Sequence, residues 1–231
     1  MKKHVYLVLG LLLLLSILAV SCESELQIQN VKDEASLKNA IGNGAKLIAL
    51  SDDIVITSPI VIDGDKKITL DMNGKTISNT EDLWDDNVND WSLVSVRDNA
   101  SLTVRGNGVF KAKENDCYAL DVQDEGADLT IENGTFIGNI HAVYVESGSL
   151  SVKGGMYSIQ QEFPDASKAY GYVLNCLDQN WTAGIARIAV SGGTFIKFNP
   201  ADCVAEGAHT NFLASGYKTV QNEDEYTVVK E

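Results

Sequence analysis

The side chains best suited to chemistry are a few carboxylates, aromatic rings and one histidine near the middle of the chain. Asp121, His141 and Tyr144 lie in or beside short apolar runs. Trp84 lies within the most acidic stretch, TEDLWDDNVND, and Trp91 directly follows it. Carboxylates and histidine can exchange protons or bind hydroxyl groups, and flat aromatic faces stack on sugar rings. These five residues form the candidate ligand-binding set.

Polysaccharide cleavage makes demands that this set meets only in part. A glycoside hydrolase needs two carboxyl groups at a fixed separation, and Asp121 with Glu146 is the pair that could supply them. A calcium-dependent lyase needs several carboxylates around one cation, together with a base. The outward positions of the expected strands and their neighbours offer only two carboxylates. We therefore assign no catalytic residue, and an enzyme is the less favoured interpretation.

Metal and cofactor binding are not indicated by the ligand spacings. The three cysteines after Cys22 match no zinc pattern, and the three histidines are scattered. The loop 80–90 has the alternating Asp and Asn of a calcium site, but Asp90 and Val96 replace the Gly and Glu of an EF-hand. A looser calcium site and a plain solvated loop both stay open there, and we assign neither metal nor cofactor.

The elements that must position these residues recur along the chain. Each unit is an alternating apolar run, then Asn-Gly or Gly-Gly, then usually an aromatic residue. The copies are ITLDMNGKTI (68–77), SLTVRGNGVF (101–110), DLTIENGTF (128–136), SLSVKGGMY (149–157) and RIAVSGGTF (187–195). A unit that recurs every 20 to 40 residues or so predicts a solenoid, in which each coil buries its apolar face against the next.

Alternation within the units predicts which side chains face the core. Three short strands are expected in each coil, with like residues stacked on like. One inward column is Val96, Val122, Val145 and Cys176, and a second is Phe110, Phe136, Tyr157 and Phe195. The outward row on the strand of the first column is Ser95, Asp121, Tyr144 and Asn175.

Asn-Gly between apolar runs is also a strong hairpin signal, so an antiparallel barrel or sandwich is the rival fold. The same position in successive units keeps the same kind of residue, which favours the solenoid.

Residues 33–41 predict a short helix capped by Asp33, with a Glu34–Lys38 pair. No helical pattern follows before Pro200.

The N-terminus carries an export signal. Lys2 and Lys3 precede an apolar run over residues 5–20, and small residues precede Cys22 in a pattern that resembles the lipobox of bacterial lipoproteins. The resemblance implies cleavage before Cys22, lipidation of Cys22, and anchoring in the outer membrane on its cell-surface or periplasmic face. Residues 1–21 are then the signal peptide, 22–30 a tether and 31–231 the domain.

The charge disfavours nucleic acid as a partner. The formal net charge is −14, and removal of the signal peptide with its two lysines makes it −16. A surface of that sign repels phosphate backbones.

Over residues 31–231 the chain resembles the right-handed parallel β-helix superfamily of pectin-lyase-like proteins. The motifs LDMNGKTI (70–77) and SGGTFIKFNPADCVAEG (191–207) are similar to those of small exported β-helix lipoproteins and adhesin-like surface proteins. The resemblance implies an all-β, single-stranded solenoid with a short N-terminal capping helix and a C-terminal cap. These motifs contain no catalytic residue.

The expected function is that of a non-catalytic, surface-anchored lipoprotein that binds a polysaccharide or host glycan, acting as a monomer. The loops 79–90 and 160–169 should emerge at one corner of the helix, about 14 Å apart, and leave a trough between them. The five candidate residues would line its floor and one end. A purely structural or protein-interaction β-helix and a polysaccharide lyase or hydrolase are the alternatives.

Overall fold

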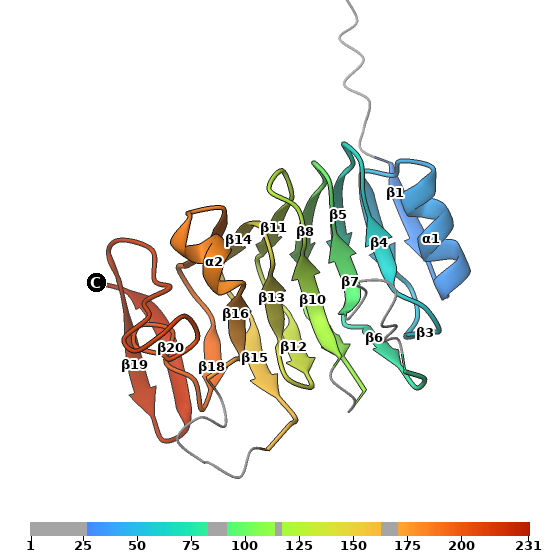
Figure 1. Ribbon diagram of the computed structural model, residues 1–231. Coiled ribbons are helices and arrows are strands. Elements are labelled where there is room, and N and C mark those ends of the chain that lie inside the picture. The colour runs from blue at the N-terminus through green and yellow to red at the C-terminus, as the bar shows by residue number, and fades with distance from the viewer. Residues whose placement is uncertain (1–26, 83–91, 114–116, 163–170) are drawn as a thin grey trace, which may run out of the picture.

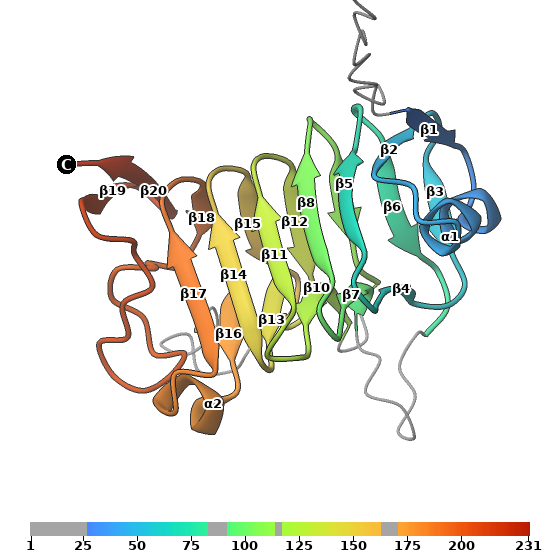
Figure 2. The same ribbon diagram turned by 90° about the horizontal axis from the view of Figure 1, so that it is seen from above.

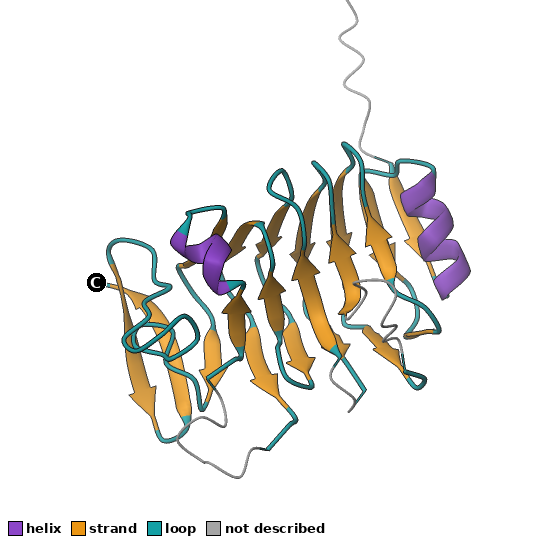
Figure 3. Ribbon diagram, viewed as in Figure 1, coloured by secondary structure: helices purple, strands orange, loops and turns teal. Residues whose placement is uncertain are grey.

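The computed structural model describes residues 27–82, 92–113, 117–162 and 171–231, which consist mostly of short strands and turns (Figure 3). The strands form three sheets, here called A, B and C. Sheet A contains β1 (Ile28–Val31), β2 (Leu47–Leu50), β5 (Lys67–Asp71), β8 (Ser101–Arg105), β11 (Asp128–Ile131), β14 (Gly148–Val152) and β17 (Ala186–Val190). All neighbours in sheet A are parallel.

Sheets B and C follow the same pattern. Sheet B contains β3 (Ile54–Ile56), β6 (Thr76–Asn79), β9 (Val109–Lys111), β12 (Thr135–Gly138), β15 (Met156–Ile159) and β18 (Thr194–Ile196), all parallel. It ends with the antiparallel hairpin β19 (Tyr217–Asn222) and β20 (Glu225–Lys230). Sheet C contains β4 (Ile60–Ile62), β7 (Ser92–Val96), β10 (Tyr118–Val122), β13 (Val143–Val145) and β16 (Leu174–Cys176), all parallel.

From β2 to β18 the chain visits sheets A, B and C in turn and then returns to sheet A beside the strand it left (Figures 1 and 2). The return distance varies: Asp128 pairs with Ser149, 21 residues further on, and Ser149 pairs with Arg187, 38 residues further on. This predominantly β, parallel arrangement is compatible with a β-helix or a similar solenoid. The parallel pairing of the repeat strands rules out the antiparallel barrel or sandwich.

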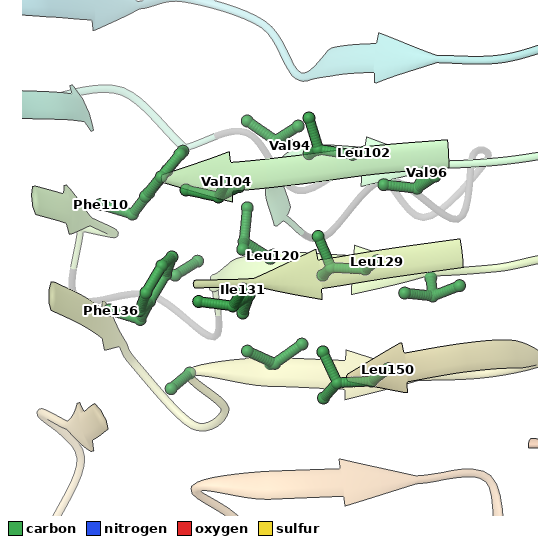
Figure 4. Packing of buried hydrophobic residues seen from close by; sticks show 14 of the residues in the cluster. Val94, Val96, Leu102, Val104, Phe110, Leu120, Leu129, Ile131, Phe136 and Leu150 are labelled. Atoms are coloured by element: carbon green, nitrogen blue, oxygen red, sulfur yellow. The ribbon is translucent and has the colours of Figure 1, made fainter. Parts of the chain in front are cut away.

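Both predicted inward columns are confirmed. Val122 pairs with Val96 and Val145, Val145 pairs with Cys176, and all four side chains are at most 2% exposed. In the second column the successive rings are nearly parallel, with centroids 5.4, 5.1 and 4.8 Å apart from Phe110 to Phe195. Figure 4 shows such side chains from all three sheets meeting in one core. Stacked rings at this spacing add to the free energy gained by burying their area.

The glycines at the corners of the coil adopt positive φ. Gly134, Gly155 and Gly193 have φ of 121°, 96° and 102°, a region that residues with a Cβ rarely adopt. A Cβ at Gly155 would also lie 2.8 Å from the Gly134 carbonyl oxygen. The repeated glycine therefore serves both the turn and the close approach of successive coils.

Helix α1 (Glu34–Gly42) covers the N-terminal end of the stack, as predicted (Figure 1). The Asp33 side chain accepts a hydrogen bond from the Ser36 backbone N–H, and Lys38 Nζ lies 2.6 Å from Glu34 Oε1. The buried face of the helix consists of Leu37, Ala40 and Ile41. The strand before it, β1, starts at Ile28, so the last three residues of the segment expected to be a tether already belong to sheet A.

The C-terminal part departs from the sequence prediction in one respect. A helix, α2 (Asp178–Thr182), lies between β16 and β17, although no helical pattern was expected there. Five residues are too few for a helical period to show in a sequence. Its Trp181 packs edge-to-face on Phe212, with ring centroids 5.2 Å apart, and so covers the core rather than offering a free face.

Cys117, Cys176 and Cys203 are buried free thiols. Burial raises the pKa of Cys117 to about 12 and that of Cys203 to about 11, so neither forms a thiolate readily at neutral pH.

Within the described part of the chain, no helix is long and apolar enough to cross a membrane.

Candidate functional site

The predicted outward row lies on the outer face of sheet C. Asp121 is directly opposite Ser95 on one side and Tyr144 on the other, and Tyr144 is opposite Asn175. The register therefore places these residues side by side along the stack, as the alternation predicted. Neighbouring parallel strands are about 4.8 Å apart, so the whole row is the length of a few sugar units.

An aromatic cluster covers this face around Tyr144. It consists of Tyr118, His141, Tyr144 and Tyr172. The His141 ring stacks on Tyr144 with a centroid distance of 5.3 Å and an interplanar angle of 15°. Tyr118 lies 4.7 Å from His141 and 5.4 Å from Tyr144, and Tyr172 meets His141 edge-on at 5.9 Å. The three tyrosines are only partly buried, so the cluster offers flat apolar area with polar edges.

His141 is a fixed, neutral member of this cluster. It is 7% exposed, and its Nδ1 lies 2.7 Å from the Tyr172 carbonyl oxygen. A carbonyl oxygen can only accept, so Nδ1 carries the proton and donates it there. Burial lowers the pKa of His141 to about 4. The ring therefore helps to hold Tyr144 and Tyr172 in place and carries no charge at neutral pH.

Asp121 is a buried carboxyl group, 1% exposed. Gln123 Nε2 donates to its Oδ2 at 2.9 Å, and its Oδ1 has no hydrogen-bond partner. Burial raises the pKa of Asp121 to about 6, against the opposing effects of the Ser95 hydroxyl, the Gln123 amide and the Arg97 charge. The Asp121 side chain therefore lies below the surface of the outer face and offers almost no accessible area to a ligand.

The C-terminal side of the face is acidic. Cys176 donates its backbone N–H to Glu206 Oε1 at 3.0 Å, so this carboxylate lies against β16, the outermost strand of sheet C. Burial and the nearby Asp178 carboxylate raise the pKa of Glu206. Burial, together with the charges of Glu146, Glu206 and Asp178, raises the pKa of Tyr144 to about 12. The Tyr144 hydroxyl is therefore protonated and able to donate at neutral pH.

A groove of about 480 Å³ lies where the sheet B strands end and the loops to sheet C begin. It is lined by Ser78, Asn79, Lys111, Ala112, Lys113 and Gln160. The loops expected to form the ends of a trough do follow sheet B strands (β6 and β15) and precede sheet C strands (β7 and β16). Trp84, Trp91 and most of both loops lie outside the described residues, as does Cys22.

Sequence reasoning found Asp121, His141 and Tyr144, which the fold brings onto adjacent strands, but missed Tyr118, Tyr172 and Glu206. Tyr118 is the first residue of β10, where alternation with Leu120 and Val122 would assign it to the inner face, so the strand pattern gave no signal for it. Tyr172 and Glu206 lie in irregular segments, where no period assigns a side chain to a face.

The arrangement offers aromatic faces for stacking and polar groups for hydrogen bonding. No group of three or more His, Cys, Asp or Glu side chains in the described ranges could hold a metal ion. Comparison with protein-family models, curated proteins and solved structures found no match, so function has to be inferred from this geometry.

Proposed function

We propose that this chain is a non-catalytic glycan-binding protein, attached to the outer membrane through Cys22, that holds a polysaccharide or host glycan on the outer face of sheet C. The observation that carries the proposal is the aromatic cluster around Tyr144. Three tyrosine rings that are partly exposed and held against a buried, neutral histidine form a rigid platform. Sugar rings stack on such platforms at little cost in side-chain entropy.

The finer fold assignment belongs to the same proposal. We infer a single-stranded, right-handed β-helix of the pectin-lyase-like kind. The A–B–C order of strands in successive coils and the stacked columns support it. Parallel strands joined by crossovers are right-handed in almost all known proteins, which supports the hand. A β-helix presents a flat, extended face along its axis, which suits a linear polymer.

The proposed address rests on the N-terminal sequence alone. A basic start, an apolar run and small residues before Cys22 support export and lipidation. Trp84, within the acidic loop, and Trp91, directly after it, are proposed to add stacking surface at one end of the site.

Binding can be tested with the whole chain solubilised in detergent and screened against immobilised polysaccharides. Tyr144→Ala should weaken binding of a retained glycan about 10- to 30-fold, because truncating a central aromatic contact typically costs about 2 kcal/mol. Thr130→Ala is the matched control, since Thr130 lies on the outer face of sheet A between Thr103 and Ser151.

Trp84→Ala and Trp91→Ala should each weaken binding to a smaller extent. Release of reducing or unsaturated ends during the screen would indicate a hydrolase or lyase instead. Unchanged binding in the folded Tyr144→Ala variant would show that the aromatic cluster is not the binding site.

A further inference from the structure

Unpaired acceptor oxygens lie on both sides of Tyr144. Asp121, opposite Tyr144 on β10, and Asn175, opposite it on β16, each have an enclosed Oδ1 without a hydrogen-bond partner, and Glu206 has such an Oε2. An enclosed acceptor that receives no hydrogen bond costs free energy, so a ligand that supplies donors gains more here than one that supplies acceptors. Asn175 and Glu206 are only half-buried as whole residues, so both side chains border the outer face of sheet C beside Tyr144.

Glu206 is held at this position by the edge of sheet C. Leu177 donates its backbone N–H back to the Val145 carbonyl, so the N–H of Cys176 points the other way, toward the open edge. Glu206 Oε1 accepts that N–H at 3.0 Å, which leaves Oε2 for another donor. The carboxylate is thus oriented before any ligand arrives.

The negative charges around Tyr144 favour a positively charged ligand. Glu146, Glu206 and Asp178 all act on Tyr144 through their negative charge. Over residues 76–231, 23 acidic residues face 10 basic ones. A uronic acid or sulfated sugar would be repelled, whereas a cationic group would be attracted.

We infer that the ligand is an oligosaccharide of amino sugars with free amino groups. This rests on the proposed glycan-binding function and names its ligand class. A sugar ring stacks on Tyr144, its ammonium group donates to Glu206 Oε2 beside Asp178, and a ring hydroxyl donates to Asn175 Oδ1. An ammonium group can be bound by these few acceptor oxygens, and it is also attracted to the faces of aromatic rings.

The test compares two probes that differ only at nitrogen: a β-1,4-linked glucosamine tetrasaccharide and its fully N-acetylated counterpart. Calorimetric titration of the whole chain in detergent at pH 6 should give about tenfold tighter binding of the free amine, because hydrogen bonds between charged groups are stronger than those between neutral groups. Raising NaCl from 50 to 500 mM should reduce this preference, since salt screens charge pairs near the surface.

Glu206→Gln keeps an acceptor for the Cys176 N–H and places a donor where Oε2 was. It should bring the preference close to one, with thermal melting as the check on folding. Asp178→Asn, at an exposed position, should lower the preference in part and serves if Glu206→Gln does not fold.

Equal affinity for the two probes, or a preference that survives both substitutions, would overturn the amino-sugar inference. So would a Tyr144-dependent affinity for a neutral or acidic glycan alone, although the glycan-binding function would then stand. Tight binding of Ca²⁺ that is lost in Glu206→Gln would assign the acceptors to a cation instead. If no glycan binds at all, the proposed function fails together with the inference.

Discussion

At the scale of single residues, the outer face of sheet C combines aromatic rings held in place by their contacts with buried polar atoms that lack a hydrogen-bond partner. His141 donates to the Tyr172 carbonyl and stacks on Tyr144, so its neutral state is part of the packing. Asp121 is enclosed and lacks a partner for one oxygen. Such groups make the stability of the domain depend on pH, and in opposite directions.

The pH dependence of Asp121 can be isolated with Asp121→Asn. Its folded pKa is raised to about 6 from 3.8, so the folded state binds a proton that the unfolded state has lost between these values. Its stabilising contribution is complete below pH 3.8 and is lost as pH rises through 6. Between pH 7.5 and pH 5 the wild-type chain should gain about 1.4 kcal/mol in unfolding free energy relative to the variant.

Urea unfolding of both proteins across this range measures the difference. The His141 contribution cancels, because its pKa is lowered in both chains and it acts in the other direction, destabilising the fold as pH falls. Parallel curves for the two proteins would contradict the raised pKa of Asp121.

At the scale of elements, the coil is specified by alternation and by the glycine corners. Val145 is fully enclosed between Val122 and Cys176, while its chain neighbour Tyr144 faces the opposite side of sheet C. Adjacent residues of one strand thus meet entirely different surroundings.

Val145→Asp should therefore abolish cooperative folding, because an unpaired buried charge costs several kcal/mol against a total stability of about 5–15 kcal/mol. Tyr144→Asp, which adds the same charge one residue away, should lower the melting temperature but leave a folded domain. Circular dichroism melts of the two variants decide the point. Equal loss in both would show that the register does not separate an inner from an outer face.

At the scale of the whole molecule, each end of the stack is covered in part. Helix α1 lies over the first coils, and the hairpin β19–β20 closes sheet B at the other end (Figure 1). Bare strand edges invite pairing with other chains, so such covers protect the edges on which they lie. The strands begin at Ile28, only six residues after the proposed lipidation site, which would hold the domain close to its membrane.

Cys22→Ser tests that attachment. The substitution removes the thiol that would carry the lipid, and stable anchoring needs more than one acyl chain. In fractionated cells the variant should move from the membrane pellet to the soluble fraction, whereas Cys117→Ser, a change at a buried thiol, should stay in the pellet. A Cys22→Ser variant that still sediments with membranes would contradict lipidation at this residue.

The sequence by itself determined the inward columns, the outward row and the capping helix. Those features depend on local rules: side chains alternate along a strand, glycine permits positive φ at a corner, and Asp33 caps the helix that follows it. Each unit of the repeat states the same pattern, so the register could be derived without knowing any contact.

Only the tertiary structure decided what surrounds the outward row. His141 and Tyr172 come from connections of different lengths. His141 meets Tyr144, and Tyr172 meets His141, only because successive coils return to the same corner. Glu206 reaches Cys176 from 30 residues away, and Asp121 is enclosed although it stands at an outward position. No periodicity governs such segments, because their paths depend on the packing of coils already formed.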